Sequence, residues 1–191
     1  MDYFQYKNDD LFAEDVAVSH IAEQFGTPCY VYAESVIREQ HERLAGAMAK
    51  ALPADRQPLL CYACQANSNI AVLSFLRSLG CGLEIVSEGE LVRGLKAGFD
   101  PDKIVATGVG KQKSEIAACL QAGIHQFNVE SLPELEMIET VAAETNKTAN
   151  VVFRLNPDVS GGGHDKISTG RKRDKLGMGV ENITKAFAVT K

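Results

Sequence analysis

The sequence has no apolar run that approaches the roughly 18 residues needed to cross a membrane. It has no excess of positive charge either, because 20 lysines and arginines stand against 25 aspartates and glutamates. A nucleic-acid-binding protein would favour a basic face, so the formal net charge of −5 argues against nucleic acid as a partner. The N-terminus also lacks the basic segment and apolar stretch of a secretory signal. We therefore expect a cytoplasmic protein without a membrane or nucleic-acid partner.

Cysteines are few, and their pattern excludes two classes of protein. The five are odd in number and scattered, at Cys29, Cys61, Cys64, Cys81 and Cys119, which does not suit a disulfide-stapled secreted domain. The C-x-x-C pair at 61 and 64 lies in an apolar strand, whose alternation sends the two side chains to opposite faces. No second pair follows at zinc-ligand spacing. We expect small buried side chains and no metal site.

What the sequence does contain is a regular alternation of strands and helices. Strands are predicted at residues 59–64, 82–86, 104–107, 125–129 and 151–156. The helices between and after them are predicted at 70–79, 88–97, 113–122 and 132–144, with a further one beginning at 183. Upstream, residues 11–13 and 30–32 are β-rich, and helices are predicted at 18–25 and 34–52. Such alternation indicates parallel βαβ units.

Two architectures fit five such strands: an open doubly wound sheet, and part of an eight-stranded (β/α)8 barrel of the TIM type. The barrel is favoured because polar residues end the strands and could converge on one face: Gln65, Glu84 or Ser87, Asn128 or Glu130, and Arg154 or Asn156. A complete barrel needs about 250 residues, so 191 residues would supply only part of one. We expect an N-terminal segment at 1–33 and an incomplete barrel at 34–191.

The first of the five strands runs straight into a polar turn and then a helix. Its sequence is CYACQANSN, residues 61–69. This arrangement delivers one side chain to the carboxyl end of a strand, where α/β barrels place their active sites. The side chain delivered here is Gln65.

Carboxylates follow the next strand, in the sequence EIVSEGEL at residues 84–91. Glu84 ends the strand, and Glu90 lies in the first turn of the following helix, so both could face one pocket. The alternative is that Glu88 and Glu90 only complement the positive end of the helix dipole. The turn TGVGK at residues 107–111 fails as a phosphate-binding P-loop, because Val105 stands where the motif needs glycine.

A positive side chain, Arg154, ends the fifth strand. An arginine at such a place is expensive to bury unpaired, so an anion or a carboxylate such as Glu130 or Glu84 should lie nearby. A long polar loop follows, with the sequence SGGGHDKISTG at residues 160–170. It contains His164 as a candidate on the substrate side of the site.

These motifs, taken in order, resemble those of the pyridoxal-phosphate-dependent decarboxylases of basic amino acids, above all the diaminopimelate decarboxylases. The resemblance covers essentially the whole chain, and the Ile-Ser-Thr-Gly element at 167–170 is its most specific marker. It implies a barrel and a second β-domain that includes the N-terminal strands. It also implies pyridoxal 5′-phosphate as cofactor, held near Ala63, Glu84, Glu90 and Arg154. The implied substrate is a small amino acid, meso-diaminopimelate, converted to L-lysine and carbon dioxide by a homodimer.

One departure from this pattern concerns the chemistry itself. Gln65 stands where the resembled enzymes have the lysine that forms the Schiff base with the cofactor. The resemblance also places other cofactor ligands of these enzymes beyond residue 191. Because an amide nitrogen is no nucleophilic amine, we expect this polypeptide to be inactive as a decarboxylase. Two alternatives stay open: a catalytically dead paralogue with a binding or regulatory role, and a racemase-like enzyme of the same barrel class.

Overall fold

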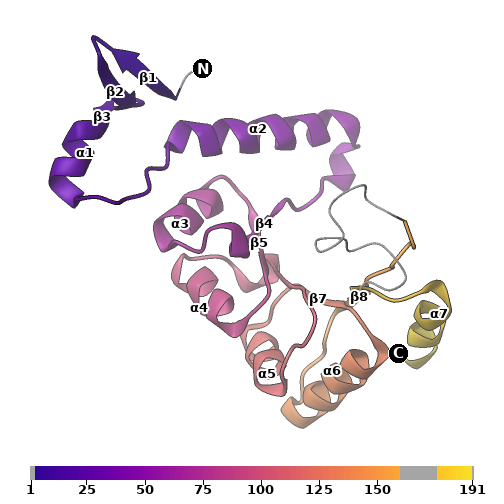
Figure 1. The fold of residues 1–191 in the computed structure, drawn as a ribbon. Coiled ribbons are helices and arrows are strands. Elements are labelled where there is room, and N and C mark those ends of the chain that lie inside the picture. Colours follow the sequence, from indigo (N-terminus) through magenta and orange to yellow (C-terminus); the bar gives the residue numbers. More distant parts are fainter. Residues whose placement is uncertain (1–2, 160–175, 191) are drawn as a thin grey trace. The chain divides into compact units, whose positions relative to one another are not determined.

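The structure is a computed structural model that describes residues 3–159 and 176–190 (Figure 1). The chain divides into two compact units, Met1–Pro58 and Leu59–Lys191. Each unit is described by itself. The division expected after residue 33 stays a prediction about the complete domains. Among the described residues, no helix has both the length and the apolar character required to cross a membrane.

The first unit combines a small antiparallel sheet with two helices. Its elements are β1 (Phe4–Lys7), β2 (Asp10–Ala13), β3 (Val16–Ala17), α1 (Val18–Phe25), α2 (Glu34–Ala51) and the 3-10 turn η1 (Ala54–Arg56). The strand expected at 11–13 is confirmed as part of β2, which pairs with β1 and β3. The β-rich segment 30–32 forms no strand, and Tyr30 is 91% exposed. Aromatic and β-branched residues favour a strand only where a neighbouring strand satisfies the backbone, and this segment has no strand partner among the described residues.

The second unit is a five-stranded parallel sheet with helices between the strands. Its strands are β4 (Cys61–Ala63), β5 (Gly82–Ile85), β6 (Ile104–Ala106), β7 (Gln126–Val129) and β8 (Val151–Phe153). Its α-helices are α3 (Ile70–Ser78), α4 (Glu88–Lys96), α5 (Lys113–Ala122), α6 (Leu132–Thr145) and α7 (Val180–Val189). Two 3-10 turns, η2 (Cys64–Ala66) and η3 (Pro101–Lys103), complete it. All five predicted strands and all five predicted helices are present, with ends that differ by a few residues.

The order of the strands decides between the two architectures that the sequence left open. Each strand lies beside the next one in the chain, from β4 through β5, β6 and β7 to β8, and every pair is parallel. A doubly wound sheet would reverse its order at a switch point, whereas a barrel wall keeps the order of the chain. Figure 1 shows α3, α4, α5 and α6 following one another along the outside of this wall.

Local signals in the sequence set the helix ends. The hydroxyls of Ser87 and Ser131 accept hydrogen bonds from the backbone N–H groups of Glu90 and Glu134, so these serines are the N-caps of α4 and α6. Helix α6 begins at Leu132, and Pro133 is its second residue, where the missing N–H has no partner to lose. Helix α7 begins at Val180, three residues before the predicted start. The sequence placed the start too late because the first turn is largely polar and shows little apolar periodicity.

The core of the second unit lies between the sheet and the helices that cover it. Its largest fully buried side chains are Phe127, Leu73, Leu83, Ile85, Ile104, Ile116, Ile138, Val129 and Val141. Strand β5 begins with a glycine for a steric reason. A Cβ at Gly82 would lie 2.7 Å from the carbonyl oxygen of Lys103 and 2.8 Å from the sulfur of Cys61. The close approach of β4, β5 and the turn before β6 therefore requires a residue without a side chain at position 82.

Candidate functional site

Polar side chains from four strand ends meet in one cavity of the second unit. The cavity has a volume of about 910 Å³ and is lined by Gln65, Glu84, Val86, Thr107, Gly108, Val109, Asn128, Val152, Arg154 and Leu176. These residues come from the carboxyl ends of consecutive parallel strands and from the turns that follow. The predicted convergence of strand ends is thus confirmed, and of the alternatives left open Glu84, Asn128 and Arg154 join Gln65 in this cavity. This edge of the sheet is where α/β barrels carry their active sites.

Gln65 reaches the cavity from a short turn rather than from the strand itself. Strand β4 ends at Ala63, and Gln65 is the middle residue of η2. Its side chain is exposed, and it lines the same cavity as Glu84 and Arg154. The carboxamide can donate and accept hydrogen bonds, but it carries no ionisable amine.

Two of the predicted cofactor residues do not line this cavity. Ala63 lies beside Glu84 in the parallel register of β4 and β5 and is half-buried. The carboxylate of Glu90 accepts a hydrogen bond from the backbone N–H of Val86 at 2.7 Å, while Ser87 caps the N–H of Glu90. This reciprocal arrangement resembles a capping box and stabilises the start of α4. The structure therefore shows that Glu90 caps the start of α4. A contact of Ala63 or Glu90 with a cofactor stays a prediction.

Arg154 is paired below the cavity with a buried carboxylate. Its Nη1 atom lies 3.0 Å from Oε1 of Glu130, whose side chain is 2% exposed against 35% for Arg154. The same Oε1 accepts from the backbone N–H of Gly108 at 3.3 Å, and Oε2 accepts from that of Gly177 at 2.9 Å. The expected carboxylate partner of Arg154 is Glu130, and the ion pair leaves the arginine at the cavity wall.

A second ion pair lies next to the first and was not predicted from the sequence. The ammonium of Lys111 lies 2.7 Å from Oε1 of Glu134, and both side chains are only 8% exposed. The same ammonium donates to the carbonyl oxygens of Gly108 and Asn128. The turn at 107–111 therefore forms part of the cavity edge, and its lysine holds the turn in place.

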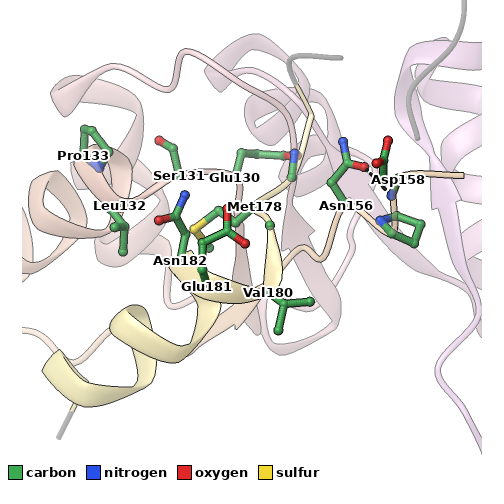
Figure 2. A pocket seen from close by; sticks show the side chains of 13 residues that line it. Glu130, Ser131, Leu132, Pro133, Asn156, Asp158, Met178, Val180, Glu181 and Asn182 are labelled. Carbon is green, nitrogen blue, oxygen red and sulfur yellow. Dashed lines mark hydrogen bonds between the residues drawn. The ribbon is translucent and has the colours of Figure 1, made fainter. Parts of the chain in front are cut away.

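Glu130 also lines a second pocket, of about 550 Å³ (Figure 2). Glu130 and Ser131 line it from the end of β7, and Asn156 lines it from the chain beyond β8. Glu181 and Asn182 come from the first turn of α7. Glu130 thus lines this pocket and pairs with Arg154, which lines the first cavity.

Cys64, the residue before Gln65, cannot serve as a nucleophile in place of an amine. Burial, together with the nearby carboxylates of Glu90 and Glu84, raises the pKa of the Cys64 thiol to about 11. A fully buried thiol with such a pKa is neither a nucleophile nor a metal ligand at neutral pH. Within the residues that the structure describes, no cluster of three or more histidine, cysteine, aspartate or glutamate side chains could hold a metal ion.

Three residues show what could and could not be predicted about this site from the sequence. His164 lies outside the described residues. Ser131 and Glu134 have the three-residue spacing of a capping box, a signal that could have located the Glu134 carboxylate at a helix start. The burial of Lys111 has no comparable signal, since a lysine after a glycine-rich turn is ordinarily exposed.

Comparison with known proteins identifies the family. The model of the "Pyridoxal-dependent decarboxylase, pyridoxal binding domain" matches residues 35–191, most of the chain. The chain belongs to this family. The wall of five strands is accordingly part of a TIM-type barrel, and the cofactor of the family is pyridoxal phosphate.

Several relatives within this family are diaminopimelate decarboxylases. Diaminopimelate decarboxylase of Pseudomonas aeruginosa is 47% identical over 188 residues, which cover 98% of this chain and 44% of that protein. The crystal structure of diaminopimelate decarboxylase from M. jannaschii superposes with a TM-score of 0.89 at 38% identity, covering 98% of this chain and 44% of that one. A Helicobacter pylori diaminopimelate decarboxylase complexed with L-lysine gives a TM-score of 0.82 at 37% identity, covering 90% of this chain and 42% of that one. The chain thus spans less than half the length of these relatives.

The residues present fit the family cofactor in one respect and not in another. A cavity of about 910 Å³ with a cationic wall at Arg154 has room and charge for an anionic pyridine derivative held without a covalent bond. Covalent attachment of a pyridoxal aldehyde needs a primary amine, and position 65 offers a carboxamide. The described site therefore fits a non-covalent pyridoxal ligand and does not fit a covalent one at Gln65.

Proposed function

We propose that the chain provides the pyridoxal-binding part of a diaminopimelate decarboxylase, the enzyme that converts meso-diaminopimelate to L-lysine and carbon dioxide. We propose further that the polypeptide with Gln65 does not itself perform this reaction. The observation that carries the proposal is the meeting of Gln65, Glu84 and Arg154 in one cavity at the carboxyl edge of the barrel wall. The diaminopimelate decarboxylases among its relatives, two of them solved with L-lysine, support the choice of substrate class.

The side chains of the cavity would bind and orient the reacting groups. When bound, pyridoxal phosphate supplies the electron sink that decarboxylation requires. Arg154, restrained by Glu130, presents a positive charge to the cavity, and Glu84 presents a carboxylate from strand β5. The two opposite charges give the cavity a polarity that fits a zwitterionic ring or amino acid. We propose Ala63, Glu90 and His164 as further contacts in the complete protein.

Gln65 limits what this cavity can do. Its amide nitrogen is not basic, so it can neither attach a pyridoxal aldehyde nor carry a proton to or from a substrate carbon. The same residue favours the second candidate function, a catalytically inactive paralogue that binds a pyridoxal derivative or an amino acid for a regulatory purpose. The two functions share a cavity and differ in chemistry.

Covalent trapping with pyridoxal phosphate and borohydride tests the role of position 65. The chain and its Gln65→Lys variant are incubated with the cofactor, reduced, and mapped by mass spectrometry. We expect a stable adduct at position 65 in the variant and only reversible binding in the parent chain. Val109→Lys is the matched control, since Val109 lines the same cavity from a loop and is exposed. Equal labelling at both introduced lysines, or none at position 65, would contradict the assignment.

A second measurement separates the two candidate functions. The parent chain and the Gln65→Lys variant are each joined to the C-terminal part of the Pseudomonas aeruginosa relative and assayed for lysine formation from meso-diaminopimelate. The decarboxylase proposal predicts turnover in the Gln65→Lys fusion alone. Turnover in the parent fusion would show that Gln65 is no obstacle. Cofactor binding without turnover in either fusion would favour the regulatory function.

A further inference from the structure

Four charged side chains form a connected cluster beneath the cavity: Arg154, Glu130, Lys111 and Glu134. Arg154 lines the cavity, whereas Lys111 and Glu134 do not touch it. Two positive and two negative charges make the cluster neutral. Burying a charge is costly unless it is paired and hydrogen-bonded, and each member of this cluster has a partner of opposite charge.

The ammonium of Lys111 joins three separate parts of the barrel wall. Its three donors match three acceptors: the carbonyl of Gly108 after β6 at 2.7 Å, the carbonyl of Asn128 on β7 at 3.1 Å, and the carboxylate of Glu134 on α6 at 2.7 Å. A lysine ammonium has no further donor, so it is fully satisfied in this place. The lysine therefore fixes the ends of β6 and β7 relative to the start of α6.

Glu134 connects Lys111 to Glu130, the ion-pair partner of Arg154. Its second oxygen, Oε2, accepts a hydrogen bond from the backbone N–H of Glu130 at 3.1 Å. The side chain of Glu130 in turn holds Arg154 at 3.0 Å and the N–H of Gly177 at 2.9 Å. A continuous path of hydrogen bonds thus runs from Lys111, through Glu134 and Glu130, to the guanidinium at the cavity wall.

The burial of the Lys111–Glu134 pair needs a reason other than stability. A buried ion pair is weak evidence for stabilisation, because apolar side chains of similar volume often replace it at no cost. What apolar side chains cannot replace is the directional contact with Gly108, Asn128 and the N–H of Glu130.

We propose that Lys111 and Glu134 are positioning residues of this cavity: through Glu130 they fix the place from which Arg154 presents its charge to a bound anion. This inference rests on the proposed function, since it takes the cavity as the site of a pyridoxal phosphate-like ligand. Neither residue contacts the ligand space. Their effect on binding is carried by the arginine.

The restraint on Arg154 is measured first, without any ligand, by NMR of the 191-residue chain. The Arg154 side-chain N–H signal is assigned by its loss in Arg154→Lys, and its exchange with water is compared in two charge-neutral double variants. Lys111→Met/Glu134→Gln removes both charges of the pair, so neither is left buried and unpaired. We expect the Arg154 N–H to exchange with water about tenfold faster in this variant, the effect of losing one charge-assisted contact. The control Lys113→Met/Glu144→Gln removes an exposed ion pair, 4.0 Å apart, between α5 and α6, and should leave the exchange unchanged.

The second readout is the affinity for pyridoxal phosphate, followed by titration. Lys111→Met/Glu134→Gln should weaken binding by about tenfold in the parent chain. In an Arg154→Met background the same change should weaken binding much less, because the two residues act only through Arg154, which is then absent. The backbone amides of β5 serve as a measure of general stability in the same samples.

Three results would overturn the inference: unchanged Arg154 exchange in Lys111→Met/Glu134→Gln, an equal loss of protection at the β5 amides, or an undiminished binding loss in the Arg154→Met background. The first two require no ligand. If the parent chain does not bind pyridoxal phosphate at all, the proposed function fails, and the NMR comparison still decides whether Lys111 and Glu134 position Arg154.

Discussion

The guanidinium of Arg154 lies 3.0 Å from the buried carboxylate of Glu130, and the two residues line two different hollows of the second unit. The arginine faces the cavity that Gln65 also lines, and the glutamate faces the pocket at the start of α7. Glu130 also holds the backbone at Gly108 and Gly177. One carboxylate therefore ties the ends of β6 and β8 and the segment before α7 together.

Replacing Glu130 by glutamine should destabilise the second unit. The change keeps the shape of the side chain but removes its charge, so Arg154 loses its partner and at least one of the accepted hydrogen bonds weakens. Because Arg154 is partly exposed, we expect a loss of about 2 kcal/mol, below the range for fully buried pairs. Urea unfolding measures it. Glu136→Gln, an exposed position on α6, should change the unfolding free energy by less than about 0.5 kcal/mol.

Adding one methyl group at Gly82 should be costly. Its Cβ would lie 2.7 Å from the backbone oxygen of Lys103, which cannot move without shifting the turn before β6. We expect Gly82→Ala to lower the free energy of unfolding by about 2 kcal/mol. Gly46→Ala is the control, because Gly46 lies in α2, where an added methyl group would meet nothing within 4 Å, and alanine should stabilise that helix by about 0.5–1 kcal/mol. Equal effects of the two changes would refute the steric argument.

The first unit should lose stability in acid through Glu14. Hydrogen bonds from the hydroxyl and backbone N–H of Ser35 hold the pKa of the Glu14 carboxyl below its ordinary value of 4.5. A folded-state pKa below the unfolded one contributes stability above pH 4.5, and this contribution disappears as the pH falls through the lowered folded value. An NMR titration of the Glu14 side chain checks the direction. Ser35→Ala should return the midpoint toward 4.5, and a parent midpoint at or above 4.5 would contradict the contact.

The cysteines should differ sharply in their reaction with iodoacetamide. Burial raises the pKa values of Cys64 and Cys119 to about 11, and both side chains are inaccessible, whereas Cys29 is exposed. At about pH 8 only a trace of either buried thiol is ionised, so we expect labelling of Cys29 while Cys64 and Cys119 stay unmodified. Mass spectrometry of digested samples gives the positions. Rapid labelling of Cys64 in the native protein would show that β4 and η2 open readily.

Much of the fold could be predicted because the signals that form it are local. Alternating apolar strands and amphipathic helices predicted the five βαβ strands, and Ser87 and Ser131 marked two helix starts through contacts made within three residues. The segment 30–32 shows where such reasoning fails. Its composition favours a strand, but a strand exists only with a partner, and partners are set by the rest of the fold.

The sequence by itself determined which segments form the five strands, the residues that end them, and the absence of an amine at position 65. Each of these is written in one segment of the chain. Only the tertiary structure decided which charges meet. The partner of Arg154 lies 24 residues away at Glu130, and the partner of Lys111 lies 23 residues away at Glu134. Side chains so far apart in sequence become neighbours through the register of parallel strands, and their burial follows from packing that no single segment contains.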